Sequence, residues 1–195
     1  MAKALLSKEE LVEKLVDIFY DYGYDGATLS VISEVTGLRR ASIYHHFPNG
    51  KVEMAEAVLA HSDRWGAEHV RSMLESELPP DEKIRRMCAA IDEVHTRPQQ
   101  LTLMNVFSYG SARLKFGEQV AQRVQRWLDQ IASLLAELDV EKQEAMQRAL
   151  DAYVQIEGAM VLARSLNDLA VFRAVMKKLP ETLLAGTAQD GRGKR

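Results

Sequence analysis

The sequence predicts an all-α fold. Apolar residues recur three and four positions apart along nearly the whole chain, and almost no segment alternates with a period of two. The 195 residues include only 5 Pro and 11 Gly, so long helices are permitted almost everywhere. With 47% hydrophobic and 27% charged residues, the composition is that of a globular protein, long enough for a small domain joined to a larger one.

The first helix is expected to begin after Ser7 and to end at Gly23. Ser7 is a good N-cap, and Glu10 stands three residues later, as in a capping box. The apolar stripe of this helix consists of Leu11, Val12, Leu15, Val16, Ile18 and Phe19.

Two short helices are expected next, from about Thr28 to Val35 and from about Arg39 to Phe47. Each is too short to be stable alone in water, so both must pack against the first helix. The apolar residues available for this packing are Leu29, Ile32, Val35, Leu38, Ile43 and Phe47. Gly37 lies in the short turn between them, where a residue tolerant of positive φ is needed, and the pattern predicts a helix-turn-helix.

Further helices are expected over about 51–77, 81–96, 99–109, 113–138, 140–165 and 168–179, with Pro79-Pro80 as the strongest break. We therefore predict three parts. Residues 1–52 form a helix-turn-helix DNA-binding domain, residues 53–185 form a helical ligand-binding and dimerisation domain, and residues 186–195 form a polar, disordered tail.

The third helix has an outward face suited to DNA. No Asp or Glu occurs from Val35 to Val52, so this stretch is a basic patch on a chain of net charge −3. Arg can bind guanine edges, Ser and Tyr suit phosphate contacts, and Thr28 would direct the N-terminus of its helix at a phosphate. The candidate DNA-binding residues are Thr28, Arg39, Arg40, Ser42, Tyr44, His45, His46 and Lys51.

These motifs resemble the TetR family of repressors over roughly residues 8–60. The resemblance rests on Thr28, Gly37-Leu38, Ser42-Ile43-Tyr44-His45-His46-Phe47 and Lys51. It implies that Arg40, Ala41, Ser42, Tyr44, His45 and His46 face the groove or the phosphates and that Lys51 contacts phosphate. Packing for Tyr44 and simple surface exposure for the two His residues are the alternatives.

One feature departs from the usual family pattern. Three residues separate Phe47 from Lys51, where most members have two. This variant resembles an LmrA/YxaF-like subgroup, and the segment from Ile156 to Arg164 is similar to the penultimate helix of that subgroup.

Small residues on the last two long helices suggest a dimer interface. The candidates are Ala149, Ala152, Ile156, Gly158, Ala159, Ala163 and Phe172, flanked by Tyr153, Met160, Leu162, Leu166, Leu169, Val175 and Met176. Small residues allow a partner helix to approach closely, and the resemblance implies a four-helix bundle between two subunits. Ordinary packing within one chain is the alternative.

The middle helices supply candidates for an effector cavity, because Met and aromatic side chains adapt to apolar ligands. They are Met87, Cys88, Ile91, Met104, Phe107, Ser108, Phe116, Trp127, Ile131 and Gln155, with Asn105 and Tyr109 nearby. Plain core packing is the alternative, and Cys88 is expected to be a small buried apolar residue.

No catalytic motif, metal site or cofactor is expected. His61 and His69 are eight residues apart on one helix, too far to share an ion, and His95 is expected to bond locally near a helix end. Neither a signal peptide nor a membrane span is expected from the apolar runs of the chain, and a cytoplasmic protein is therefore expected.

The sequence thus favours a ligand-responsive repressor. It would bind a near-palindromic DNA operator as a homodimer, and a small apolar or aromatic effector would release it by shifting the fourth helix. The alternatives are a ligand-independent DNA-binding regulator or activator and, more remotely, an all-α metal-dependent enzyme, which would need carboxylates and His facing one core.

Overall fold

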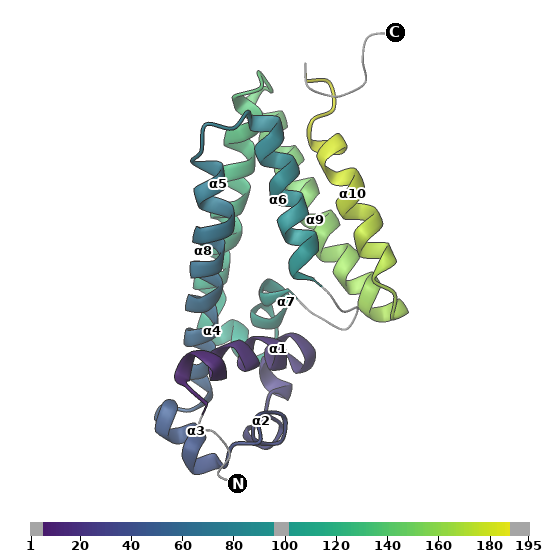
Figure 1. The fold of residues 1–195 in the computed structure, drawn as a ribbon. Helices are drawn as coiled ribbons and strands as arrows, with labels where there is room; N and C mark the ends of the chain where they lie inside the picture. Colours follow the sequence, from purple (N-terminus) through teal and green to yellow (C-terminus); the bar gives the residue numbers. More distant parts are fainter. Residues whose placement is uncertain (1–5, 96–101, 188–195) are drawn as a thin grey trace. The chain divides into compact units, whose positions relative to one another are not determined.

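The computed structural model describes residues 6–95 and 102–187, and within these ranges the chain folds into helices joined by turns, without a strand (Figure 1). The predicted all-α class is confirmed. The chain divides into two compact units, residues 1–67 with 101–117 (the first unit) and residues 68–100 with 118–195 (the second unit). The predicted domain boundary near residue 52 therefore lies inside the first unit, where α4 packs against α1.

The first unit contains α1 (Lys8–Gly26), α2 (Leu29–Thr36), α3 (Arg40–His46), α4 (Lys51–Gly66), α7 (Leu103–Ser108) and the start of α8 (Gly110–Ala136). The capping box is present: Ser7 N–H donates to Glu10 Oε2 at 2.7 Å, and Glu10 N–H donates to Ser7 Oγ at 3.1 Å. Gly23, predicted as the end of α1, has φ 67 and interrupts the helix, which continues to Gly26.

Aromatic rings fill the core of the first unit. Phe19, Tyr24, Phe107 and Phe116 are buried, with neighbouring ring centroids 5.3 to 6.0 Å apart. The expected contribution of Val35 to this core is wrong, because its side chain is 49% exposed. Its neighbour Thr36 is buried instead, and its hydroxyl donates to a backbone carbonyl of the preceding turn.

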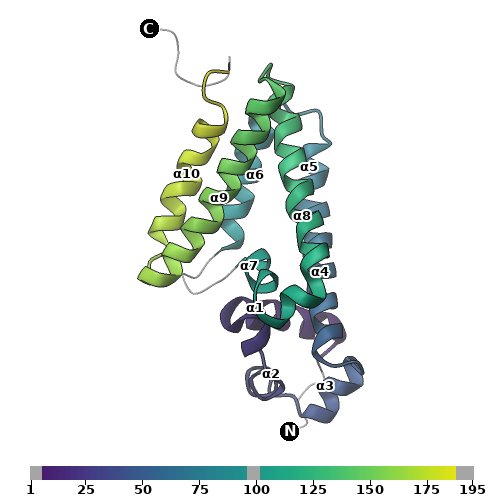
Figure 2. The ribbon, with the colours of Figure 1, turned by 180° about the vertical axis from the view of Figure 1, so that it is seen from behind.

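The second unit contains most of η1 (Ala67–Arg71), then α5 (Ser72–Leu74), α6 (Pro80–Val94), the rest of α8, α9 (Lys142–Leu166) and α10 (Ala170–Leu183). The helix expected over 51–77 is thus interrupted by a π-helical turn at 67–71. In this unit α10 packs against both α9 and α6, as Figure 2 shows from behind. Arg148 on α9 fastens the end of α10 by donating to the carbonyls of Leu183 and Ala185, at 3.0 and 2.7 Å.

The predicted dimer face requires correction. Six of its seven residues are at most 6% exposed within the chain itself, where they pack in the core of the second unit: Ala149, Ala152, Ile156, Ala159, Ala163 and Phe172. Side chains already buried inside one chain have no surface to bury against another, so intrachain packing is correct for these six. Gly158 remains exposed.

A different side of α9 carries exposed apolar residues. We call this set the α9 apolar face: Leu150, Val154, Val161, Leu162 and Leu166, which are 43%, 61%, 48%, 52% and 63% exposed. Their spacing places them along one side of the helix.

Candidate nucleic-acid interface

The turn between α2 and α3 is fixed by local hydrogen bonds. Thr28 caps α2, because its hydroxyl accepts from Val31 N–H at 3.3 Å. At the other end of α2, Gly37 has φ 68 and closes the helix in the left-handed conformation that glycine adopts without penalty. Ser33 Oγ then donates to the carbonyl of Leu38 at 2.5 Å, which holds the chain as it enters α3.

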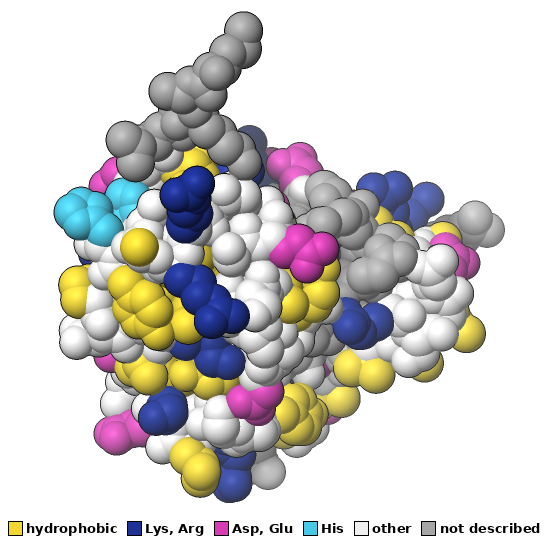
Figure 3. Space-filling view, turned by 90° about the horizontal axis from the view of Figure 1, so that it is seen from below, with side chains coloured by type: hydrophobic (Ala, Val, Ile, Leu, Met, Phe, Trp, Pro, Cys, Tyr) yellow, Lys and Arg dark blue, Asp and Glu magenta, His cyan; other side chains and the backbone are white. Residues whose placement is uncertain are grey.

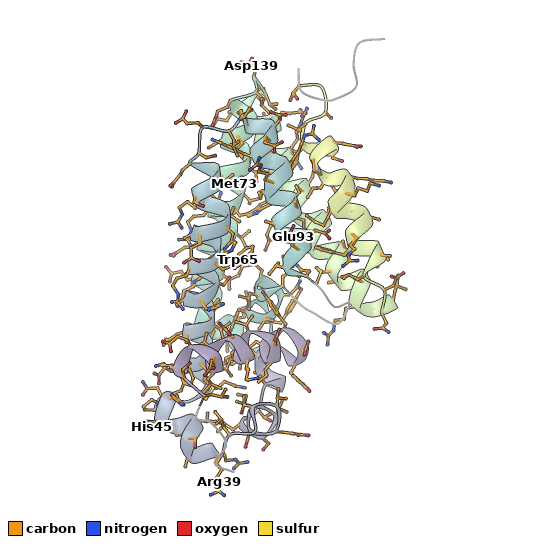
Figure 4. The ribbon with its side chains drawn as sticks, viewed as in Figure 1. Arg39, His45, Trp65, Met73, Glu93 and Asp139 are labelled. Carbon is orange, nitrogen blue, oxygen red and sulfur yellow. The ribbon has the colours of Figure 1, made fainter. Side chains whose placement is uncertain are left out.

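Helix α3 has one buried and one exposed side. Ile43 and, directly after the helix, Phe47 are fully buried. Arg39, Arg40, Ala41, Tyr44 and His45 are exposed, and Ser42 and His46 are half-buried. The labelled Arg39 and His45 lie on the α3 side of the first unit (Figure 4), and Figure 3 shows several Lys and Arg side chains on this face, with His at one edge and hydrophobic and acidic side chains among them.

Tyr44 combines two of the roles considered for it. Its side chain is 45% exposed, so the ring is accessible. Its Cε1 also lies 3.7 Å from the position where a Cβ on Gly50 would stand, so the ring packs over the start of α4.

Arg40 is held across the helix-turn-helix. One guanidinium nitrogen donates to Ser30 Oγ on α2 at 2.9 Å. This bond fixes the direction of an exposed cation at the first turn of α3, where a guanidinium can meet a base edge or a phosphate.

Lys51 is half-buried at the first residue of α4, where it bonds to the end of α1. Its ammonium donates to the carbonyls of Tyr24 and Asp25, at 2.8 and 3.4 Å, and lies 4.5 Å from the centre of the Tyr24 ring. Partial burial lowers the pKa of Lys51, and the nearby Asp25 carboxylate opposes that shift. In this arrangement the ammonium ties the first residue of α4 to the end of α1, and the implied phosphate contact stays a prediction.

The extra residue before Lys51 is accommodated in a closed turn. Gly50 has φ 67, and its N–H donates to the carbonyl of Phe47 at 2.9 Å. Asn49 N–H donates to one carboxylate oxygen of Glu53 at 3.0 Å, while the other lies 3.4 Å from Lys8 Nζ. Sequence reasoning missed Lys8 and Glu53 because 45 residues separate them and neither belongs to a local motif.

The predicted effector residues divide between the two units. Met87, Cys88 and Ile131 are buried in the core of the second unit, with Ile91 and Trp127 packed half-buried against it. Met104, Phe107, Ser108 and Phe116 lie in the first unit, where both Phe rings belong to the aromatic core. Gln155 is exposed on α9, so its expected role as a polar anchor within an apolar cavity is wrong.

Cys88 and His95 occupy buried positions in the second unit. Cys88 is 2% exposed, as expected of a small apolar residue, and burial raises the pKa of its thiol to about 12, which leaves it protonated at neutral pH. Burial also lowers the pKa of His95, whose Nδ1 bonds to the carbonyl of Ile91 at 2.8 Å. Cys88 thus serves packing, and His95 adds a local hydrogen bond.

Two surface grooves lie within the second unit. One, of about 810 Å³, runs between the end of α8 and the start of α9 and includes Ala132, Ala136, Met146 and Leu150. The other, of about 390 Å³, lies between α8 and the segment of η1 and α5 that contains Arg71 and Leu74. Neither groove is lined by a predicted effector residue.

Within residues 6–95 and 102–187, no three side chains of His, Cys, Asp or Glu converge as a metal site would require. Within the same ranges, no helix combines the length and apolar character that crossing a membrane demands.

Comparison with known proteins places the helix-turn-helix in a family. The model of the bacterial regulatory proteins of the tetR family matches residues 11–58. Over 113 residues, the chain is 31% identical to the HTH-type transcriptional regulator TtgW of Pseudomonas putida, covering 55% of this chain and 77% of that protein. The regulator SrpR of the same species is also 31% identical over 113 residues, covering 55% of this chain and 48% of that protein.

Solved structures share the fold over nearly the whole chain. A TetR transcriptional regulator from Legionella pneumophila superposes with a TM-score of 0.76 at 19% identity, covering 93% of this chain and 99% of that one. A cysteine mutant of the TetR family regulator CifR, solved with 26 bp of double-strand operator DNA, gives 0.72 at 16% identity, with 95% and 98% covered. With 113 residues matched by sequence and nearly its whole length matched by fold, the chain belongs to the TetR family of bacterial transcriptional regulators, which are DNA-binding proteins and not enzymes.

Proposed function

We propose that this regulator is a cytoplasmic, ligand-responsive repressor. It binds a near-palindromic operator as a homodimer and leaves the operator when a small apolar or aromatic effector binds. The observation that carries this proposal is the exposed side of α3, which presents Arg39, Arg40 and His45 from a segment without any acidic residue between 36 and 52. Repression is supported by relatives whose names include it, such as the repressor AcnR of Corynebacterium efficiens, 26% identical over 106 residues.

The proposed DNA contacts follow from the two sides of α3. Arg39 and Arg40 read base edges or bind phosphates, Ser42, Tyr44, His45 and His46 add polar contacts, and Ala41 allows close approach of the helix to the groove. Thr28 directs the N-terminus of α2 at a phosphate, as a helix end favours anions. The turn from Pro48 to Gly50 supports the proposed LmrA/YxaF-like subgroup, since it accommodates the additional residue without disturbing Phe47.

A homodimer is proposed because no part of residues 6–95 and 102–187 covers the α9 apolar face. Large aliphatic side chains exposed in one continuous row are typical of a protein–protein interface. Gly158 lies on the exposed part of α9 between Val154 and Val161, where the absence of a side chain lets a second helix approach. A two-fold dimer would place two copies of α3 about 34–36 Å apart, one turn of B-DNA, and would demand a near-palindrome.

The effector is proposed to bind in the second unit near Trp127. This half-buried ring lies 5.5 Å from the ring of Tyr153, and both pack against the core that includes Met87 and Ile131. Such a surrounding of aromatic and Met side chains suits an apolar or aromatic compound. A regulator that works without a ligand is the alternative, and it would show no thermal stabilisation with any such compound.

The test starts with selection of binding sites from genomic DNA by the purified protein. The selected DNA is then bound to wild type and to Arg39→Ala, Arg40→Ala and Arg126→Ala, the last an exposed arginine of α8 in the second unit. Loss of a phosphate contact should lower the slope of log affinity against log salt by about 1, and loss of a base contact should relax sequence preference. Equal affinity and slope in all four proteins would refute α3 as the DNA-binding element.

A further inference from the structure

The end of α1 is joined to the start of α8 by a single carboxylate. Asp25 Oδ1 accepts from Ser111 Oγ at 2.5 Å, and Asp25 Oδ2 accepts from Ser111 N–H at 3.0 Å. The two residues are 86 positions apart in the sequence, and both lie in the first unit. The first N–H groups of a helix have no partner within it, and a carboxylate placed there both accepts their hydrogen bonds and opposes the positive end of the helix dipole.

Gly110 makes this approach possible. Its φ is 58, and a Cβ at this position would overlap Asp25 Oδ2. Any larger residue at 110 would therefore displace the carboxylate or the start of α8, so the junction depends on a glycine as well as on its two bonding partners.

The same short segment of α1 also holds α4. The carbonyls of Tyr24 and Asp25 accept from the Lys51 ammonium, so residues 24 and 25 bind α4 through the main chain and α8 through the Asp25 side chain. Lys51 directly follows the turn that leads out of α3. A shift of residues 24 and 25 would therefore move the start of α4, and with it the turn that leads out of α3.

Helix α8 belongs to both compact units. It runs unbroken from Gly110 to Ala136, with its first residues in the first unit and the remainder in the second. In the second unit it contributes Leu128, Ile131 and Leu135 to the core. A displacement of α8 within that core can reach Ser111 because both belong to one continuous helix.

We infer that the Asp25–Ser111 pair is a latch that couples the second unit to the DNA-binding helices, so that a change in α8 reaches Lys51 through residues 24 and 25. The inference rests on the proposed ligand response and assigns its route within the first unit. Asp25 and Ser111 are positioning residues in this route, since they act on α3 through Lys51 and the turn before it.

The test compares full-length wild type with Ser111→Ala, which removes the hydroxyl, and Ser111→Thr, which keeps one. Ser133→Ala is the matched control, an exposed serine further along α8. Hydrogen–deuterium exchange is measured first on the free proteins. Ser111→Ala should exchange about fivefold faster than wild type over residues 110–117. It should also exchange faster at the first turn of α4, although Ser111 bonds to α1. Unchanged exchange at α4 would overturn the inference, whether or not the protein binds DNA.

The second measurement adds the selected operator. Wild type, Ser111→Thr and Ser133→Ala should show slower exchange in α8 beyond residue 118 when DNA is bound at α3, and Ser111→Ala should lose most of this response. The latch would be overturned if exchange in α8 of Ser111→Ala slowed on DNA binding as much as in wild type. It would also be overturned if DNA-bound wild type showed no slowing of exchange there. Failure of wild type to select any DNA would instead refute the proposed function, and the free-protein measurement would then decide the latch alone.

Discussion

At the scale of single residues, the charged groups near α3 make contacts that their positions in the sequence do not predict. Lys51 fits the family motif of a phosphate-binding residue, yet its ammonium donates to two main-chain carbonyls of α1. Asp25 belongs to no motif, yet its carboxylate joins two helices. Local sequence identifies residue types, whereas partners distant in the chain decide what each charge contacts.

Replacing Lys51 should weaken the first unit. Lys51→Gln removes the charge and shortens the side chain, so the carbonyls of Tyr24 and Asp25 lose their donor, at a cost of about 1 kcal/mol in the free energy of unfolding. Urea denaturation at neutral pH measures this change. Lys115→Gln, an exposed lysine of α8 in the same unit, should be close to wild type. Equal stability of the two variants would show that the Lys51 contacts contribute nothing.

The titration of Asp25 should make the free energy of unfolding depend on pH in the acidic range. Hydrogen bonds from the Ser111 hydroxyl and then its N–H, with a contribution from the Lys51 charge, hold the pKa of Asp25 below its ordinary value of 3.8. As pH falls, the unfolded state therefore takes up the proton first, so stability present above 3.8 is lost as pH drops through the folded-state pKa.

Asp25→Asn removes this titration. The variant should be less stable than wild type at neutral pH, and the difference should narrow as pH falls below about 4. Thermal melting followed by circular dichroism from neutral to acidic pH gives the comparison. Glu13→Gln serves as control, since Glu13 is exposed on the same helix. Parallel pH profiles for Asp25→Asn and wild type would contradict the assignment.

At the scale of elements, turns and caps were the features that sequence predicted best. The capping box at Ser7 and the glycine turn at Gly37 each depend on residues within a few positions of one another, and both are present. The helix expected over 51–77 is interrupted at 67–71, where no proline or turn motif marks the π-helical turn. A change of hydrogen-bond register leaves little trace in a helical pattern.

Two glycine replacements should have opposite effects. Gly37→Ala forces a Cβ into a left-handed conformation and should cost about 1 kcal/mol of stability. Gly66 lies at the end of α4 with open space around the position of a Cβ, so Gly66→Ala should be neutral or stabilise by up to about 1 kcal/mol. Chemical denaturation of both variants tests the contrast, which fails if they change stability in the same direction.

At the scale of the whole molecule, burial decides which face of α9 is available to a partner. The sequence places small and aliphatic residues on most sides of this helix. The fold buries the small ones against α10 and the rest of the second-unit core, and leaves the α9 apolar face in solvent.

Charges on this face should break the proposed dimer. Leu162→Glu places a carboxylate where a partner helix would bury it, which is unfavourable without a compensating charge. The variant should elute and scatter light as a monomer and bind operator DNA more weakly. Leu114→Glu is the control, because Leu114 is 84% exposed on α8 outside the α9 apolar face and should leave the mass of the assembly unchanged. If Leu162→Glu and Leu114→Glu formed assemblies of the same mass in solution, the proposed interface would be refuted.

The sequence by itself determined the all-α class, the helix-turn-helix and the family, because helical periodicity, caps and a recognition motif are local properties of the chain. Tertiary structure alone decided that Lys51 bonds to the end of α1, that Asp25 joins α1 to α8, and that Ala149 and Phe172 lie in the core of one chain. Each of these outcomes depends on contacts between segments that lie far apart in the sequence. Those contacts determine how exposed a side chain is and which groups it can bond to, and the local sequence does not specify them.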